Sequence, residues 1–254
     1  MKIEAAFGDM PLAALEDPRA RGEFKKWRDQ WADKPRTADY AWMVLARTIS
    51  WGKDRGRVRT NPCERGGRIY RSDRSEIVWT EADIGRFMAV APDHLKVALL
   101  MGLWTGQRIG DLRTVTWSAY DGEFIRLKQS KTGRRVAIRV GAPLKAVLDA
   151  LPRRAVTILT TEKGTSWTHF GFQSSWRKAV AEAGLGDLHF HDLRGSAVSR
   201  LAEAGCTEAE IASITGHALH EVGKMIDRYL KRSEKLAEAA ILKLESRTIQ
   251  DQTL

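Results

Sequence analysis

The sequence predicts a mainly α-helical fold with one small antiparallel β-sheet, divided between two domains. Apolar residues recur at helical spacing over most of the 254 residues. Short runs of β-branched and aromatic residues gather between residues 114 and 140. A basic stretch with several glycines, which starts near residue 53, separates an N-terminal from a C-terminal part. We therefore expect domains at residues 1–74 and 75–254.

The N-terminal part, roughly residues 10 to 60, is predicted to be helical. Large apolar side chains recur at helical spacing before Pro35, and the spacing resumes after it. From Lys53 to Arg74, eight basic residues accompany three acidic ones. We expect this stretch to be a basic linker between the domains, with a solvated loop as the plainer alternative. Its position favours contact with a phosphate backbone, through the candidate DNA-binding residues Arg55, Arg57 and Arg59.

The C-terminal part begins with signals for helix starts and stops. Residues 80–83 resemble a capping box, so a helix is expected to begin there. The next helix is expected to span Asp93 to Thr105, because Gly106 follows as a stop signal, and another opens around Arg108. Short strands are expected next, with turns between them, at residues 114–117, 124–127 and 136–140.

The remainder of the chain is predicted to be helical. A capping box at residues 207–210 starts one of these helices, and Gly205 and Gly216 mark the ends of two. The expected segments are 144–151, 174–183, 193–204, 207–216 and 222–230, followed by an amphipathic tail at 236–244.

Composition and charge limit the classes of protein to which the chain can belong. Lys and Arg number 42 and Asp and Glu number 32, which gives a net charge of +10 and favours a polyanionic partner. Two cysteines are too few for a disulfide framework or a cysteine-rich zinc module. The longest apolar run, residues 97–104, is too short to span a membrane, and the N-terminus lacks a signal peptide. We expect a soluble, cytoplasmic protein.

Two local features place basic side chains at turns. Arg108 directly follows a helix break, and Asp111 lies three residues further on, where its carboxylate can orient the guanidinium toward a phosphate. The expected hairpin at residues 126–139 carries six basic residues and no acidic one, with Lys131 at its turn. A structural reading is open for each: an ordinary ion pair for the first and a charge-blunted sheet edge for the second.

Two further features combine histidines with an arginine or a tyrosine. His191 and Arg194 are three residues apart at an expected helix start, so their side chains face the same way. His217 follows the glycine that ends a helix. Tyr229 lies twelve residues later on an apolar helix and is the only tyrosine after Tyr120.

These features together resemble the tyrosine recombinases, the family of phage integrases and related resolvases. The residues that match the family pattern are, in order, Arg108, Lys131, His191, Arg194, His217 and Tyr229. The resemblance covers roughly residues 78 to 235 and implies a tyrosine-recombinase catalytic domain. The N-terminal helices resemble the family's core-binding domain more loosely, in a shortened form. The stretch from His217 to Tyr229 is longer than is usual in the family, by about one helical turn.

The resemblance implies that the chain cleaves DNA by transesterification. Tyr229 would attack the phosphorus atom and form a 3′-phosphotyrosyl bond. Arg108 and Arg194 would neutralise the non-bridging oxygens as charge builds in the transition state, and His217 would donate a further hydrogen bond. Arg134 and Arg135 on the hairpin would add contacts to the duplex.

Two residues are implied to move protons. A phenol has a pKa of about 10, so the attacking oxygen needs help to lose its proton, and His191 is the candidate base. The 5′-oxygen leaves poorly unless it is protonated, and Lys131 is the candidate general acid. The arginines take the charge-neutralising role of a metal ion, so no metal and no other cofactor is expected.

The resemblance also implies partners and a biological role. We expect a site-specific recombinase that integrates or excises a mobile element, acts on double-stranded DNA, and is associated with the nucleoid. A homotetramer is expected on synapsed DNA and a monomer or dimer in free solution, with an accessory DNA-bending protein as a possible partner. An apolar stripe in the tail either docks on a neighbouring subunit or folds back; its residues are Ala237, Ala240, Ile241 and Leu244.

Three alternative functions are weighed. A metal-dependent phosphodiesterase would use histidines and a carboxylate near the expected site, but Arg194 and Lys131 would repel the cation; the candidate ligands are His189, His191, Asp192, His217 and His220. A non-catalytic DNA-binding protein, or prophage remnant, is the second alternative. The third is a topoisomerase-like nicking and resealing activity, which the same residues would support.

Overall fold

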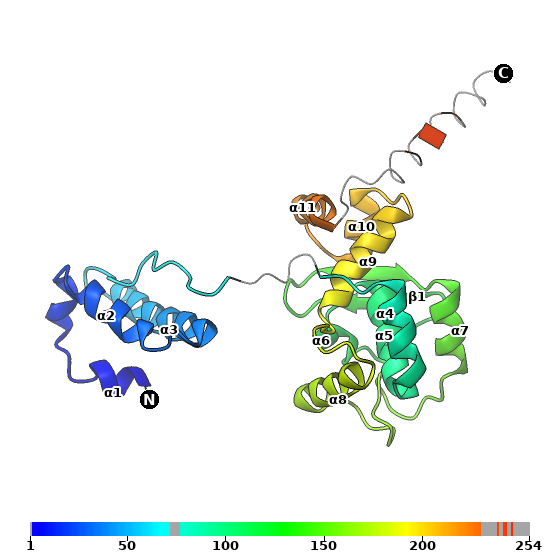
Figure 1. The fold of residues 1–254 in the computed structure, drawn as a ribbon, viewed down its shortest axis with the longest axis horizontal. Helices are drawn as coiled ribbons and strands as arrows, with labels where there is room; N and C mark the ends of the chain where they lie inside the picture. The colour runs from blue at the N-terminus through cyan, green and yellow to red at the C-terminus, as the bar shows by residue number, and fades with distance from the viewer. Residues whose placement is uncertain (1, 72–76, 230–237, 239–240, 243–244, 246–254) are drawn as a thin grey trace. The chain divides into compact units, whose positions relative to one another are not determined.

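The computed structural model describes residues 2–71, 77–229, 238, 241–242 and 245. The chain divides into two compact units, Met1–Asp73 and Arg74–Leu254, one residue from the expected boundary (Figure 1). The described residues are mostly helical and contain one two-stranded antiparallel sheet, which confirms the predicted fold class. Within the described ranges, no helix has both the length and the apolar character that crossing a membrane requires.

The first unit is helical, as predicted. Its helices pack through a core of aromatic and aliphatic side chains that includes Phe24, Trp27, Trp42 and Leu45. Pro35 occupies the first turn of the longest helix, where the missing backbone N–H has no partner to lose. The elements are α1 (Lys2–Phe7), the 3-10 helix η1 (Leu12–Glu16), α2 (Ala20–Asp29) and α3 (Pro35–Asp54).

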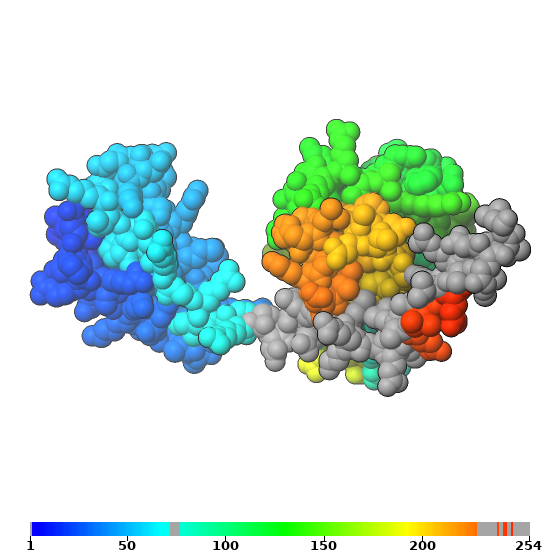
Figure 2. Space-filling view, turned by 90° about the horizontal axis from the view of Figure 1, so that it is seen from above, coloured from blue at the N-terminus to red at the C-terminus, as the bar shows by residue number. Residues whose placement is uncertain are grey.

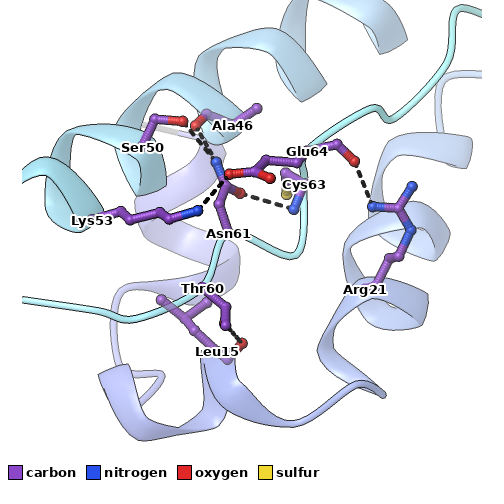
Figure 3. Close-up of polar contacts among 9 residues, drawn as sticks. All are labelled: Leu15, Arg21, Ala46, Ser50, Lys53, Thr60, Asn61, Cys63 and Glu64. Atoms are coloured by element: carbon purple, nitrogen blue, oxygen red, sulfur yellow. Dashed lines mark hydrogen bonds and ion pairs between the residues drawn. The ribbon is translucent and has the colours of Figure 1, made fainter.

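The segment after α3 differs from the expected basic linker between the domains. Residues 57–70, here called the strap, fold back onto the first unit, with Val58 and Cys63 buried in its core. Figure 3 shows how the strap is held. The Asn61 amide donates to the Ala46 carbonyl at 2.9 Å, and the Arg21 guanidinium donates to the Glu64 carbonyl at 2.8 Å. The charge of the strap resembles that of a linker. However, the buried side chains of Val58, Cys63 and Asn61 fix the strap to the first unit.

The second unit carries eight α-helices and the sheet among its described residues. Both predicted capping boxes form, at Thr80–Asp83 and at Thr207–Glu210. The elements are α4 (Glu81–Val90), α5 (Asp93–Thr105), α6 (Ile109–Leu112), the 3-10 helix η2 (Trp117–Ala119), β1 (Phe124–Lys128), β2 (Arg135–Arg139), α7 (Ala142–Ala150), α8 (His169–Glu182), α9 (Asp192–Glu203), α10 (Glu208–Thr215) and α11 (Leu219–Tyr229).

Two expectations for the second unit were wrong in detail. Residues 114–117 do not form a strand; Thr116 makes a single bridge to Thr157, and Trp117 begins η2. Helix α8 begins at His169 rather than near residue 174, because the Thr168 hydroxyl accepts a hydrogen bond from the Gly171 backbone and caps it. The predicted tail at 236–244 lies almost entirely outside the described residues.

Helix α5 is the centre of the second unit. Most of its residues are buried, including Leu99 and Met101, which are fully enclosed, and α9 packs along it. A smaller apolar cluster joins α9, α10 and α11 through Val198, Ile211 and Val222. Helices α10 and α11 lie at one end of the unit and α8 at the other (Figure 1). The surface of α10 and α11 adjoins that of the β1–β2 region (Figure 2).

Candidate active site

The end of α5 and the start of α6 place Arg108. Gly106 ends α5 in the left-handed conformation, with a φ of 61°, which a residue with a side chain adopts only at a cost. Arg108 then stands at the N-cap of α6. One of its terminal nitrogens, Nη1, is buried and has no hydrogen-bond partner within the described part of the chain.

Arg194 lies in the first turn of α9, with 4% of its surface exposed. Its Nη1 donates to the Gly106 carbonyl, and its Nε donates to His217 Nε2 at 2.9 Å. Its Nη2 is buried without a partner among the described residues. Burial and then the nearby Arg108 charge lower the pKa of Arg194 to about 10, so the group stays charged at neutral pH. The positive charge of Arg108 therefore reaches the Arg194 guanidinium.

His217 follows Gly216, which ends α10 with a φ of 69°. Its Nδ1 lies 2.9 Å from Thr215 Oγ1, and that hydroxyl donates to the Ile211 carbonyl at 2.7 Å. The hydroxyl must therefore accept from Nδ1–H, which leaves Nε2 as the acceptor for Arg194. These hydrogen bonds require that the His217 imidazole is neutral and carries its proton on Nδ1.

Stability should depend on pH through His217. Burial and then the Arg194 charge lower its pKa from 6.5 to about 4, with smaller contributions from Arg108 and Arg134, while Glu221 opposes the shift. The unfolded chain binds the proton more readily, so stability is full above pH 6.5 and falls as pH drops toward 4. The loss is at most about 3 kcal/mol, since each pKa unit corresponds to about 1.4 kcal/mol.

The measurement is the free energy of unfolding from pH 7.5 to pH 4.5, for the wild type and for His217→Asn. The pKa values of His191 and His94 are also lowered, so both proteins should lose stability in acid. The wild type should lose more, because only it must protonate residue 217. Equal losses in the two proteins would show that His217 is not held neutral.

His191 lies near the same two arginines, and Lys131 lies near His191. His191 is the exposed N-cap residue of α9. Partial desolvation lowers its pKa most, followed by the charge of Arg194, with smaller effects from Arg108 and Lys131. Lys131 is exposed in the turn between β1 and β2. Five of the six residues predicted from the sequence therefore gather around one site.

The sixth residue, Tyr229, is the last residue of α11, and its side chain lies outside what the structure describes. Tyr120 is the other tyrosine of the second unit. It is buried, and its hydroxyl donates to Asp149 Oδ1 at 2.8 Å. Burial and that hydrogen bond raise the pKa of Tyr120, which makes its phenol a poorer nucleophile. Tyr120 is thus held in a structural contact of the second unit.

Asp111 contacts a different residue from the one predicted. Its Oδ1 accepts from the Ser130 backbone N–H at 2.8 Å and from the Ser130 hydroxyl at 2.7 Å. It therefore holds the base of the β1–β2 turn, and the described residues show no hydrogen bond from Arg108 to Asp111. The expectation failed because spacing along one helix cannot show that a turn from later in the chain supplies nearer donors.

The predicted DNA-contacting arginines fall into two sets. Arg134 and Arg135 are exposed on the hairpin, and Arg134 also donates to the Gly216 carbonyl at 3.2 Å. In the first unit, the guanidiniums of Arg55 and Arg57 lie 4.3 Å and 5.6 Å from the exposed Trp51 ring centre. Arg59 approaches Glu16 at 4.0 Å. The structure thus brings Arg134 close to the site and places the other set on the first unit.

Sequence reasoning missed the residues that join these segments. Gln107, Gln129 and Thr215 are fully or almost fully buried, and each stands next to or close to a predicted site residue. Their position beside predicted site residues was the sequence feature that could have identified them. Neutral amides and hydroxyls carry no charge pattern, so nothing else distinguished them. Among the described residues, no group of three histidine, cysteine or acidic side chains is placed to hold a metal ion.

Comparison with known proteins gives a consistent result. The model of the phage integrase family matches residues 78–235. The shufflon-specific DNA recombinase of Escherichia coli is 29% identical over 179 residues, covering 66% of this chain and 43% of the recombinase. The integrase of Mycobacterium phage D29 is 25% identical over 246 residues, covering 85% of this chain and 64% of the integrase. The chain thus spans less than two thirds of the length of either relative.

Solved structures show a similar fold. A lambda integrase dimer bound to a COC′ core site aligns with a TM-score of 0.69 at 21% identity, covering 88% of this chain and 68% of that one. A lambda integrase tetramer bound to a Holliday junction aligns with a TM-score of 0.63 at 21% identity, covering 78% of this chain and 64% of that one. At this level of identity, the structural likeness establishes the fold.

Proposed function

The chain belongs to the phage integrase family, and on that premise we propose that it is a site-specific DNA recombinase that cleaves and rejoins DNA through a 3′-phosphotyrosyl intermediate. The observation that carries the proposal is the pair of buried, unpartnered guanidinium nitrogens, Arg108 Nη1 and Arg194 Nη2. Buried donors without partners are costly, because each has lost its hydrogen bonds to water. An anion bound between them would remove that cost.

A phosphodiester is the anion that best fits these donors. Two guanidiniums can each donate to a non-bridging oxygen, and these bonds strengthen as negative charge builds on the oxygens during attack. His217 Nε2 borders the same space, since Arg194 donates to it. An incoming phosphate would favour the protonated imidazole, which could then donate as well. The site is therefore suited to stabilise a pentavalent phosphorus.

The chemical step balances without an external energy source. The Tyr229 oxygen forms a bond to phosphorus while the bond from phosphorus to the 5′-oxygen breaks. The phenol proton passes to a base, for which His191 is the candidate, and the leaving oxygen takes a proton from Lys131. The phosphotyrosyl bond keeps the energy of the broken ester, so a second 5′-hydroxyl can reverse the reaction on another strand.

We propose that the first unit is a core-binding domain and that it contacts the duplex. Along α3, Tyr40, Met43 and Trp51 are exposed at helical spacing. Arg55 and Arg57 pack against Trp51, so cations and aromatic rings share one surface. Cations there would pair with phosphates, whereas aromatic side chains contact sugars and bases. Lambda integrase dimers and tetramers on DNA support the further proposal of a tetramer on two synapsed duplexes.

Lys131→Ala tests the proposed chemistry. The variant should cleave ordinary DNA about 10²- to 10⁴-fold more slowly, because the 5′-oxygen would leave without a proton. It should cleave DNA with a 5′-bridging sulfur at close to the wild-type rate, since a thiolate leaves unprotonated. The measurement is single-turnover formation of a covalent protein–DNA adduct on a nicked duplex, whose sequence is first selected from a random library for tight binding.

The matched control for this experiment is Lys163→Ala, which removes a lysine from a loop outside the proposed site. It should behave as the wild type on both duplexes. Equal slowing of Lys131→Ala on the two duplexes would remove Lys131 from the role of general acid. A wild type that binds the selected duplex but never forms an adduct would support a non-catalytic DNA-binding protein instead.

A further inference from the structure

A buried network of amide groups joins three of the segments that carry the site. Gln107 Nε2 donates to the Thr105 carbonyl at 3.0 Å and to the Ile214 carbonyl at 2.8 Å. Gln129 Nε2 donates to Gln107 Oε1 at 2.7 Å and to the Thr215 carbonyl at 2.8 Å. The exposed fractions of Gln107 and Gln129 are 1% and 0%. The network thus links the turn before Arg108, the base of the hairpin and the end of α10.

Gln129 also fixes the turn that carries Lys131. Its backbone N–H donates to the Arg134 carbonyl at 2.8 Å, and its carbonyl accepts from Gly133 at 2.9 Å, which closes the loop. Its side-chain Oε1 accepts from the Thr132 hydroxyl at 2.8 Å. The side chain therefore holds the residue after Lys131 on one side and the core network on the other.

The space around the Gln129 amide is fully used. A Cβ atom at Gly216 would overlap the amide, and the φ of 69° at that position also favours glycine. Both side-chain hydrogens and the oxygen of the amide have partners. A neutral group satisfied in this way cannot act on the reaction through charge. Its influence must come through the position of the segments that it joins.

We propose that Gln129 is a positioning residue for the general acid. Its side chain sets the position and orientation of the Lys131 turn relative to the proposed phosphate site. The proposal rests on the proposed function and deepens it. The turn residues 130–134 are all exposed and lack a core of their own. The contacts that tie them to the unit are the Gln129 and Thr132 bonds, the Ser130 bonds to Asp111 and the Arg134 bond to Gly216.

Gln129→Leu should reproduce the signature of Lys131→Ala. Leucine fills a similar volume and keeps the backbone hydrogen bonds, but it makes none of the three side-chain hydrogen bonds, so the turn would shift relative to the core network. Cleavage of ordinary DNA should fall by about 10²-fold, as expected for a misplacement of about 1 Å. Cleavage of DNA with a 5′-bridging sulfur should stay within about threefold of the wild type, because that substrate needs no acid. The double variant Gln129→Leu, Lys131→Ala should be no slower than Lys131→Ala alone.

A structural role without positioning would give a different result. General damage to the unit would slow both substrates equally and would add to the effect of Lys131→Ala, and either result overturns the proposal. Thr132→Val removes only the outer hydrogen bond, so it tests the same idea if Gln129→Leu unfolds; it should show a smaller loss with the same rescue. Gln173→Leu, an exposed glutamine of α8, is the matched control and should equal the wild type.

The same experiment separates this proposal from the proposed function. If the wild type forms no adduct on either substrate, or if Lys131→Ala is not rescued by sulfur, the assignment of the reaction or of its acid has failed. If the wild type forms the adduct and the 5′-bridging sulfur rescues Lys131→Ala, but sulfur does not rescue Gln129→Leu, only the positioning role has failed.

Discussion

Replacing Arg194 by lysine is expected to reduce the rate of DNA cleavage by about 10²- to 10³-fold, although the positive charge is kept. The guanidinium donates to Gly106 and to His217, and its buried Nη2 is the nitrogen that we propose binds the phosphate. A lysine ammonium is a compact charge on a flexible chain and cannot hold that geometry. The measurement is the single-turnover cleavage rate at saturating DNA, with duplex affinity measured separately.

Affinity for the duplex should change much less than the rate. Most of the binding free energy comes from phosphate contacts elsewhere, whereas the Arg194 bond strengthens in the transition state. Arg177→Lys, on the exposed face of α8, is the matched control and should be neutral. Thermal unfolding of both variants reports any loss of folding. A folded Arg194→Lys variant with a rate close to that of the wild type would contradict the proposed pocket.

Replacing Tyr229 by phenylalanine is expected to abolish the covalent protein–DNA adduct. The change removes one oxygen atom, and without it no bond to phosphorus can form, whereas charge and bulk stay the same. Denaturing electrophoresis after incubation with the nicked duplex measures the adduct directly. Binding to the same duplex should be retained, because the DNA contacts proposed above do not depend on the phenol.

Tyr120→Phe provides the matched control for this result. It removes the hydroxyl that donates to Asp149, which should cost about 1 kcal/mol of stability and leave the adduct yield unchanged. An adduct formed by Tyr229→Phe at the wild-type level would show that another residue is the nucleophile.

Several helix boundaries could be predicted because their signals are local. The span of α5 is as predicted, since the left-handed turn at Gly106 depends on the backbone of that one residue. The two capping boxes are equally local, because a side chain bonds to a backbone three residues away. The placement of His191 and Arg194 at the start of one helix was also predicted, because they lie three residues apart.

The parts that sequence did not predict depend on partners far along the chain. Residues 114–117 have strand-like composition, but a strand needs a neighbour, and Thr116 finds only one bridging residue. The strap resembled a linker because its basic residues outnumber Val58 and Cys63, the apolar residues that anchor it. The contacts of Asp111 and Gln129 follow from the position of the hairpin against α6 and α10, which no spacing rule gives.

The most direct test of the account is to locate the DNA adduct within the protein by mass spectrometry. Wild-type adduct is digested with nuclease and with a protease that cleaves after glutamate, which releases residues 222–234 as one peptide containing a single tyrosine. This peptide should carry the remaining nucleotide on Tyr229. A nucleotide attached to any other peptide, or cleaved DNA with a free 3′ end and no modified peptide, would contradict it.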